Sequence, residues 1–434
     1  MTADRPLRIC FVAYRGNMRC GGQGVYLWFL ARELAKLGHE VDVFVGPPYP
    51  DPMPFAGELT ELPNQQFWAG WFSRDRSKIL PEGAPLRVFE PLNFYELAGS
   101  YLGFLPEPFA FSVRAFSALS AQLKRGRRWD VVHDVQCLGW GILGLHALGL
   151  PVVSTIHHPL TVDRRASFVR DTNLREAIGT MHFYPIGMQS FVARRIERIF
   201  TSSQASAGQI QRDFGVRPEQ LAMVANGVDT ELFSPDPSVA RDPNEILCVG
   251  RASDPNKGVA TLVEALARLP APARLTLVDD DHPDNSALKR ARELGCADRL
   301  DVVGRVPIDT LVRLYRRAAV VAVPSRYEGF GLPAAEAMSC ATPVVATRAG
   351  ALPEVVATGG GGVLVNRDDP EDLAKGLARL LEQPEARAEL GARGRTGIAT
   401  AYSWPRIAAA TAAIYAEAIA SRRGRPDRTT TSAS

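Results

Sequence analysis

The chain has 434 residues, of which 46% are hydrophobic and 22% charged, and its formal net charge is +3. That length exceeds one ordinary hydrophobic core and predicts two or three domains. The small net charge gives no reason to expect a nucleic-acid partner, and the six scattered cysteines lack a metal-binding spacing and favour a reducing compartment.

The first half of the chain alternates strand and helix patterns. An apolar strand, RICFVAY, leads into a turn with Gly21 and Gly22, a helix over residues 25–37 and a second strand, VDVFV. Further strands are expected at 86–90, 130–135, 151–156 and near 196–203, whereas the proline-rich and aromatic region 47–108 is predicted to form loops. Such alternation is typical of a parallel sheet with helices on both faces.

A second alternating pattern begins after a proline-rich stretch at 224–244. Strands are expected at 245–251, 274–280, 299–306 and 320–325, with shorter ones at 344–348 and 361–365. We therefore predict two doubly wound domains, residues 1–225 and 226–402. A C-terminal helix at 403–421 is expected to cross back to the first domain, and 422–434 to be disordered. Ligands of open α/β sheets lie beyond the carboxyl ends of the strands, so the expected site is a cleft between the domains.

The most informative motif is PSRYEGFGLPAAEAM, which places Glu328 before a glycine-rich turn and Glu336 about one turn into the following helix. Pro333 suits the first position of a helix. The turn 329–332 would then present free backbone N–H groups to an anion, and the two carboxylates would accept hydrogen bonds from vicinal hydroxyls. The alternative is an ordinary helix with acidic residues near its start.

Two cations follow another strand, in VGRASDPNKG. Arg251 and Lys257 would supply positive charge to a leaving diphosphate, although an ordinary surface loop also carries such residues. In the first half, Gly21 and Gly22 precede a helix as in a phosphate-facing loop, but the full GxGxxG and the P-loop lysine are absent. His157, in VVSTIHHP, and its rival His133, in DVVHDV, are candidates for orienting a hydroxyl, against a buried structural role for either.

Together these motifs resemble the glycosyltransferases of family 4, which have a GT-B fold of two facing Rossmann-like domains. The resemblance covers nearly the whole chain: Glu328, seven residues and Glu336 match its E-x7-E motif, and NGVD at 226–229 and GR…KG at 250–258 match as well. Two departures are the acidic turn 279–281 and Ala341, which stands at a helix end where glycine is usual and φ is often positive.

The resemblance implies a retaining, metal-independent transfer of a hexose-type sugar from a nucleotide-diphosphate sugar to an acceptor hydroxyl. The acceptor would be lipid-linked, a polysaccharide or a small glycoside, bound by the first domain. Glu336 would bind the ribose and His157 the donor sugar or the reacting hydroxyl. The other implied donor-site residues, which hold the sugar and the phosphates, are Gly21, Gly22, Arg251, Lys257, Glu328, Gly329, Phe330, Gly331 and Leu332.

Three alternatives stay open at this point. One is a non-catalytic sugar-nucleotide-binding subunit that supports a partner enzyme, and another is a phosphorylase of the same architecture. The third reads Asp279–Asp281 as a D-x-D site for Mg²⁺ or Mn²⁺.

The start of the chain does not resemble a signal peptide, and no apolar run reaches the roughly 18 residues of a membrane span. We expect a cytoplasmic protein, and the Arg-rich, aromatic stretches within 160–198 are compatible with peripheral association with the inner membrane face.

Overall fold

A computed structural model describes residues 5–18, 22–65, 85–168, 180, 185–280, 282 and 284–423. The chain divides into two compact units. The first comprises residues 1–202, 206–224 and 407–434, and the second comprises 203–205 and 225–406.

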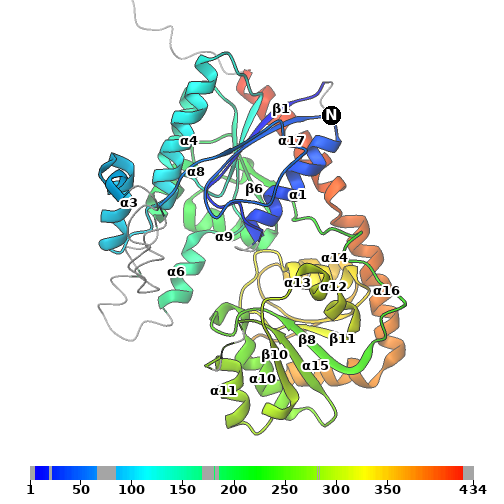
Figure 1. The fold of residues 1–434 in the computed structure, drawn as a ribbon. Helices are drawn as coiled ribbons and strands as arrows, with labels where there is room; N and C mark the ends of the chain where they lie inside the picture. The colour runs from blue at the N-terminus through cyan, green and yellow to red at the C-terminus, as the bar shows by residue number, and fades with distance from the viewer. Residues whose placement is uncertain are drawn as a thin grey trace, which may run out of the picture. The chain divides into compact units, whose positions relative to one another are not determined.

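The first unit is built on a parallel sheet flanked by helices (Figure 1). Its seven described strands have the order β3-β2-β1-β4-β5-β6-β7. The strands are β1 (Arg8–Ala13), β2 (Glu40–Val45), β3 (Glu58–Glu61), β4 (Val131–Val135), β5 (Val152–Thr155), β6 (Arg198–Thr201) and β7 (Leu221–Met223). β1, β2 and β4 are almost wholly buried, which is the pattern of strands covered on both faces.

The helices of the first unit are amphipathic or apolar segments between these strands. They are α1 (Gly22–Lys36), α3 (Pro91–Tyr101), α4 (Glu107–Lys124), α5 (Trp140–Ala147), α6 (Leu160–Phe168), α8 (Ile186–Ala193) and α9 (Gln204–Phe214). α9 begins at a residue of the second unit, and from Ser206 it belongs to the first. One core cluster, which includes Phe44, Phe111 and Ile142, lies between the sheet and helices α4 and α5.

Two sequence predictions in this unit were wrong. Residues 86–90 were expected to form a strand, but Pro85–Phe89 form a 3-10 helix, η2, in which Leu86 and Phe89 are exposed. An apolar run becomes a strand only where a neighbouring strand pairs with it, and here none does among the described residues. The region 47–108, expected to be loops, also contains β3 and α3, and α3 begins at a proline, which is favourable at a first helical position.

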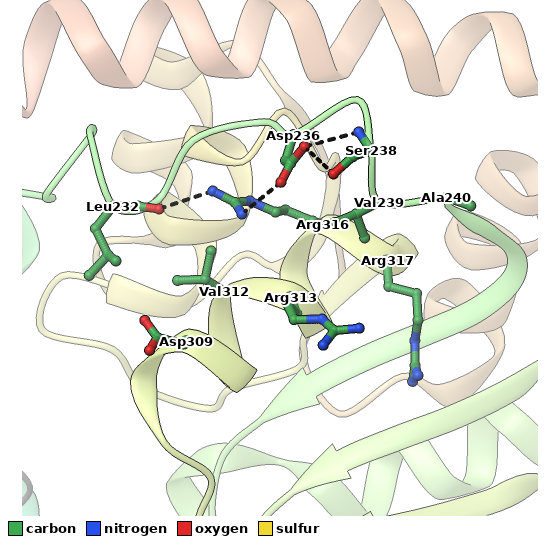
Figure 2. Close-up of a pocket in the computed structure, with 10 residues that line it drawn as sticks. All are labelled: Leu232, Asp236, Ser238, Val239, Ala240, Asp309, Val312, Arg313, Arg316 and Arg317. Carbon is green, nitrogen blue, oxygen red and sulfur yellow. Dashed lines mark hydrogen bonds and ion pairs between the residues drawn. The ribbon is translucent and has the colours of Figure 1, made fainter.

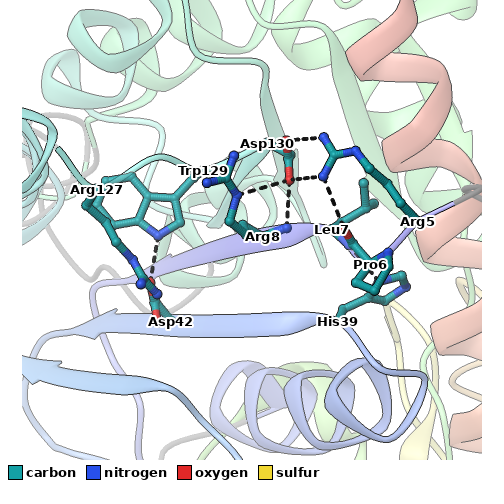
Figure 3. Close-up of polar contacts among 9 residues, drawn as sticks. All are labelled: Arg5, Pro6, Leu7, Arg8, His39, Asp42, Arg127, Trp129 and Asp130. Carbon is teal, nitrogen blue, oxygen red and sulfur yellow. Dashed lines mark hydrogen bonds and ion pairs between the residues drawn. The ribbon is translucent and has the colours of Figure 1, made fainter.

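Two buried carboxylates, Asp130 and Asp42, form hydrogen bonds and ion pairs at the amino-terminal edge of the first sheet (Figure 3). Asp130, at the start of β4, accepts hydrogen bonds from the Arg5 guanidinium at 2.7 Å and from the Arg8 backbone N–H at 2.8 Å. Asp42 of β2 accepts from Trp129 Nε1 at 2.8 Å and from Arg127 Nε at 3.0 Å. These ion pairs and hydrogen bonds therefore connect β1 and β2 to the segment that leads into β4.

The second unit is also built on a parallel sheet, whose six described strands have the order β10-β9-β8-β11-β12-β13. The strands are β8 (Asp242–Val249), β9 (Arg274–Val278), β10 (Leu300–Val303), β11 (Ala318–Val323), β12 (Val344–Thr347) and β13 (Gly362–Val365). The helices are α10 (Val259–Arg268), α11 (Ser286–Glu293), α12 (Ile308–Arg317), α13 (Leu332–Ser339), α14 (Leu352–Gly359), α15 (Pro370–Glu382) and α16 (Pro384–Ala401). Two core clusters of this unit contain, among others, Leu262 and Leu277 in one and Tyr315 and Met338 in the other.

The last helix, α17 (Trp404–Arg423), begins in the second unit and from Ile407 onward belongs to the first. There the Tyr415 hydroxyl lies 2.5 Å from His133 Nδ1, and the Arg422 guanidinium donates to Glu197 Oε1 at 3.1 Å. The C-terminal helix is thus an integral part of the first unit.

In each sheet the strand order reverses once, between β1 and β4 in the first unit and between β8 and β11 in the second. Such a reversal is the topological switch point at which doubly wound sheets bind ligands, beyond the carboxyl ends of the strands. The predicted fold class, two Rossmann-like parallel-sheet domains, is confirmed.

Candidate active site

The turns that follow β8 and β11 meet at the switch point of the second sheet. The turn after β8 contains the 3-10 helix η4 (Pro255–Lys257) and ends at Gly258, which has φ 63°. A Cβ atom at Gly258 would lie 2.0 Å from the Pro324 carbonyl oxygen, just after β11. Glycine is therefore required here on two grounds, the left-handed backbone and the close approach of the two turns.

Lys257 and Glu328 form an ion pair across this junction. Lys257 Nζ lies 2.6 Å from Glu328 Oε1, and both side chains are mostly buried, with 28% and 11% of their surfaces exposed. Burial alone lowers the pKa of Lys257, but the Glu328 carboxylate more than offsets it, so the net pKa is raised and the ammonium stays charged. Ser325 Oγ donates to the same carboxylate oxygen at 2.9 Å.

Glu328 Oε2, by contrast, accepts no hydrogen bond in the described part of the chain. The backbone of Glu328 is fixed as well, because its carbonyl accepts from the Ala351 N–H at 2.9 Å. Gly350, with φ 53°, packs against that carbonyl so closely that a Cβ atom would lie 2.1 Å from the oxygen. Sequence reasoning missed Ser325 and Gly350; the glycine beside a strand end was the available signal.

The glycine-rich turn leads into α13 as predicted from the sequence. Gly331 is the N-cap with φ 97°, and proline stands within the first two helical positions. The backbone N–H groups of Phe330, Gly331 and Leu332 find no acceptor among the described residues. Phe330 is buried and packs edge-on against Tyr402, with ring centroids 5.2 Å apart. Free N–H groups at the positive end of a helix dipole are suited to an anion.

Glu336, one turn into α13, faces a different environment from Glu328. Burial raises the pKa of its carboxyl to about 7, although a hydrogen bond from the Tyr315 hydroxyl, at 2.8 Å from Oε2, acts in the opposite direction. The side chain keeps part of its surface exposed. The two acids of the motif therefore both keep some exposed surface, but they are held by different groups.

Arg251 is not brought into contact with the Lys257–Glu328 pair. Its side chain is 62% exposed and its nearest acid is Asp254, at 3.8 Å. The turn that carries Arg251 is held by Asp279, whose Oδ2 accepts from the Ala252 N–H at 2.8 Å and from Asn285 Nδ2 at 2.9 Å. Asp279 thus supports a turn after β8, a role that the sequence did not reveal.

The rest of the acidic turn gives no cluster. Asp280 pairs with Arg305 at 2.9 Å, and Asp281 lies outside the described residues. Within the described chain, no group of three or more His, Cys, Asp or Glu side chains is arranged to hold a metal ion. Nor does that part of the chain contain a helix both long and apolar enough to span a membrane.

In the first unit the two candidate histidines differ sharply. His133, on β4, is fully buried, and both ring nitrogens are engaged, Nδ1 with Tyr415 at 2.5 Å and Nε2 with Thr155 Oγ1 at 2.6 Å. His157, after β5, is 8% exposed, and neither ring nitrogen has a hydrogen-bond partner among the described residues. Burial lowers the pKa of each to about 3, so both are neutral at pH 7. A buried polar group without a partner requires an explanation, and a bound ligand is one.

The loop after β4 positions His157. Gln136 has φ 58° and Leu138 has φ 51°, values that cost energy in non-glycine residues and cluster at functional sites. The Gln136 side chain accepts from the His157 N–H at 2.9 Å and donates to the His158 carbonyl at 3.1 Å. The ring of His157 meets Tyr26 edge-on, with centroids 4.9 Å apart. Gln136 was not predicted, since nothing in its sequence context indicates a positive φ.

The glycine loop after β1 is described only in part. Gly22 is the exposed first residue of α1, and Gly21 lies outside the described residues. The crowded glycine is Gly24, where a Cβ atom would lie 2.2 Å from the Asn17 carbonyl oxygen. Close packing of the loop on α1 is the evident reason for glycine at that position.

A hollow of about 580 Å³ lies in the second unit, away from the switch point (Figure 2). It is lined by residues of the proline-rich stretch 224–244 and by α12. Because α12 runs into the amino end of β11, the hollow lies at the opposite edge of the sheet from Glu328. Two of its cations are already paired, Arg316 with Asp236 at 3.4 Å and Arg317 with Glu245. Its position at the opposite edge of the sheet separates this hollow from the Lys257–Glu328 pair.

Comparison with known families and curated proteins gives matches along nearly the whole chain. The family described as Glycosyltransferase Family 4 matches residues 20–232, and the family described as Glycosyl transferases group 1 matches residues 229–397. An MMP alpha-(1->4)-mannosyltransferase of Mycolicibacterium hassiacum is 40% identical over 425 residues, covering 95% of this chain and 99% of that protein. A D-inositol 3-phosphate glycosyltransferase of Acidothermus cellulolyticus is 31% identical over 96% of this chain and 92% of its own length.

Solved structures share the fold at lower identity. Sucrose-phosphate synthase from Thermosynechococcus elongatus has a TM-score of 0.70 at 24% identity, covering 95% of this chain and all of that one. Anabaena HepE in complex with UDP-glucose has a TM-score of 0.66 at 20% identity, covering 96% and 100% of the two chains. The identity to curated relatives extends over both units. The chain therefore belongs to glycosyltransferase family 4, with the group 1 glycosyltransferase domain in its second half, and is an enzyme that transfers a sugar from a nucleotide-sugar donor.

Proposed function

We propose that this enzyme transfers a mannosyl residue from a nucleotide-diphosphate mannose to a hydroxyl of a glycoside acceptor, with retention of the anomeric configuration and without a metal. The observation that carries the proposal is the Lys257–Glu328 pair, 2.6 Å long, beside the free N–H groups that begin α13. The choice of mannose rests on the name of the relative that is 40% identical over nearly the full length of both chains.

The chemistry assigned to this site follows from its charges. A departing nucleoside diphosphate develops negative charge, which Lys257 and the N–H groups of Phe330, Gly331 and Leu332 are placed to stabilise. Exposed Arg251 is assigned to the same diphosphate, which it would reach by a change of side-chain rotamer. Because these groups supply fixed positive charge and dipoles, the proposal needs no metal ion for this task.

The two acids are assigned to hydroxyl groups of the donor. Glu328 Oε2, which accepts no hydrogen bond in the described chain, is available to a hydroxyl of the sugar while Lys257 and Ser325 hold Oε1. Glu336 is assigned to the ribose, whose vicinal hydroxyls are suitable donors to a carboxylate. Gly21 and Gly22 are proposed to let the start of α1 come close to the phosphate, because glycine has no side chain. Gly329 is proposed to do the same in the turn before α13.

In the first unit, His157 is assigned to the reacting centre as a neutral hydrogen-bonding group. Its unpartnered ring nitrogens and its low pKa, about 3, support contact with a hydroxyl rather than a charge. Retention is proposed to result from attack by the acceptor hydroxyl on the face that the diphosphate leaves, with the acceptor proton passing to a departing phosphate oxygen. Closure over the donor would limit hydrolysis.

The acceptor is proposed to be a saccharide. Relatives named D-inositol 3-phosphate glycosyltransferases, at 28–32% identity, make an inositol phosphate the second candidate. We keep a lipid-linked acceptor and peripheral contact with the inner membrane face as part of the proposal. In support, the Arg195 guanidinium stacks on the Phe191 ring at 3.3 Å, and Trp140 is 41% exposed beside Phe191.

The test is a binding panel followed by a transfer assay. Melting temperatures of the purified protein are measured with UDP, GDP and ADP and with their mannose and glucose conjugates, each with EDTA or Mg²⁺. We expect one nucleotide to stabilise the protein equally in EDTA and in Mg²⁺, and its mannose conjugate to support transfer to a mannoside with an α-linked product. An absolute requirement for a metal, or a product with inverted anomeric configuration, would refute the mechanism. The catalytic control is Glu328→Gln, which should bind the nucleotide but not transfer the sugar.

A further inference from the structure

The second acid of the motif is held by a residue from another helix. The hydroxyl of Tyr315, on α12, donates to Glu336 Oε2 on α13 at 2.8 Å. Tyr315 is fully buried, whereas Glu336 retains exposed surface. Because the hydroxyl is buried, the carboxylate that receives it also relieves the cost of desolvating it.

The tyrosine ring itself has little freedom to move. It packs against Phe233, with ring centroids 5.9 Å apart and an interplanar angle of 71°. Its backbone carbonyl accepts from Thr342 Oγ1 at 2.6 Å, at the point where α12 gives way to β11. The position of the hydroxyl is therefore set by the core of the second unit and not by the solvent-facing side chains near the site.

The arrangement leaves one carboxylate oxygen available. Within the described chain, Glu336 Oε1 has no hydrogen-bond partner, just as Glu328 Oε2 has none. In both acids, then, the protein holds one oxygen and leaves the other for a ligand. At Glu328 the holding groups are Lys257 and Ser325, and at Glu336 the holding group is Tyr315.

We propose that Tyr315 is a positioning residue for donor binding, which fixes the rotamer of Glu336 and directs its second oxygen toward the ribose hydroxyls. This inference rests on the proposed role of Glu336 as the ribose-binding acid. A tyrosine that served only to fill the core would contribute through its ring alone. The hydroxyl therefore distinguishes the two roles, because its loss changes ribose recognition only if it positions Glu336.

The experiment uses Tyr315→Phe, which keeps the ring and its packing on Phe233 and removes only the hydroxyl. Affinities of the full-length protein are measured by calorimetry for UDP, GDP and ADP and for the 2′,3′-dideoxy form of each. The readout is the ratio of the two dissociation constants for the nucleotide that binds most tightly. Two further variants complete the set: Glu336→Gln, and Thr276→Val, which removes a hydroxyl–carboxylate hydrogen bond of 2.7 Å to Glu245 within the same sheet.

We expect wild type and Thr276→Val to prefer the ribonucleotide by at least tenfold. In Tyr315→Phe the preference for the ribonucleotide should fall three- to tenfold relative to wild type. Its affinity for the dideoxy ligand should be unchanged. Full wild-type discrimination in Tyr315→Phe, alongside its loss in Glu336→Gln, would overturn the inference while sparing the proposed function. Full discrimination in Glu336→Gln, or no nucleotide binding by wild type, would overturn the ribose role of Glu336 and this inference with it.

Discussion

Replacing each of the two histidines of the first unit by phenylalanine should separate a structural role from a functional one. His133→Phe removes two hydrogen bonds and leaves the Tyr415 hydroxyl buried without a partner, while Thr155 keeps its bond to the Tyr26 hydroxyl at 2.9 Å. A buried polar group that loses its partner costs about 1–3 kcal/mol. The additional ring volume in a fully buried position adds strain, so we expect a loss of about 2–4 kcal/mol.

His157→Phe makes the same chemical change where no hydrogen bond within the described chain is lost. The new ring can still pack on Tyr26, and the desolvation of two unpaired nitrogens is removed. We therefore expect stability within about 1 kcal/mol of wild type, since only the added ring volume opposes the change. Sugar transfer should nevertheless fall at least a hundredfold, because the nitrogens assigned to the reacting hydroxyl are gone.

The two variants are compared by scanning calorimetry of the full chain and by initial rates of transfer. With about 2–4 °C per kcal/mol for a unit of this size, His133→Phe should melt about 4–16 °C below wild type and His157→Phe within about 4 °C of it. Equal destabilisation by both changes would refute the reasoning. So would normal turnover of His157→Phe, since the unpartnered nitrogens would then have no function.

Further predictions concern the second unit. Lys257→Met should destabilise the protein by about 1–3 kcal/mol, because it leaves the Glu328 carboxylate unpaired. The double variant Lys257→Met/Glu328→Gln should recover most of that stability in urea titrations but should not regain transfer. If the stability losses of the two changes were additive, the two side chains would not interact as an ion pair. Because the pKa of Glu336 is about 7 when no ligand is bound, nucleotide affinity should increase as the pH rises from 6 to 8 and then level off, and Glu336→Gln should abolish this rise in calorimetric titrations at each pH. The same raised pKa means that the folded state holds this proton more tightly than the unfolded chain, so ionising Glu336 costs stability between about pH 4.5 and 7 and no further above that. Ala341→Gly should stabilise the protein by about 0.5–1 kcal/mol by removing the strain of φ 56° at that alanine, and a lower urea midpoint would contradict it.

The sequence predicted those parts of the molecule that depend on local pattern. Continuous apolar runs predicted the six described strands of the second sheet and five of the first, but not β3 or β7, and the glycine-rich turn before Pro333 predicted the start of α13. Ala341, which stands at a helix end where glycine is usual, has a positive φ of 56°. Each of these features is written within a few neighbouring residues, where spacing and residue type suffice.

Features that depend on contacts between distant segments were not predictable. The Tyr315 hydroxyl reaches Glu336 from a different helix, and Ser325 shares a carboxylate oxygen with a lysine 68 residues earlier in the chain. The positive φ of Gln136 depends on its side-chain bonds to the loop after β5. The segment Pro85–Phe89 was wrongly predicted as a strand for the same reason. Its local apolar pattern suits a strand, but no strand of the described chain pairs with it, and it forms a 3-10 helix.

The position of α17 has a consequence for biosynthesis. The first unit takes residues from both ends of the chain, and its buried His133 bonds to a tyrosine 282 residues further along. Domains of a nascent chain generally fold in order from the N-terminus. Here the N-terminal domain cannot complete its core on the ribosome until the whole of the second domain has emerged. We expect the nascent first half to depend on chaperones for that interval, and its final folding step to coincide with release of the finished chain.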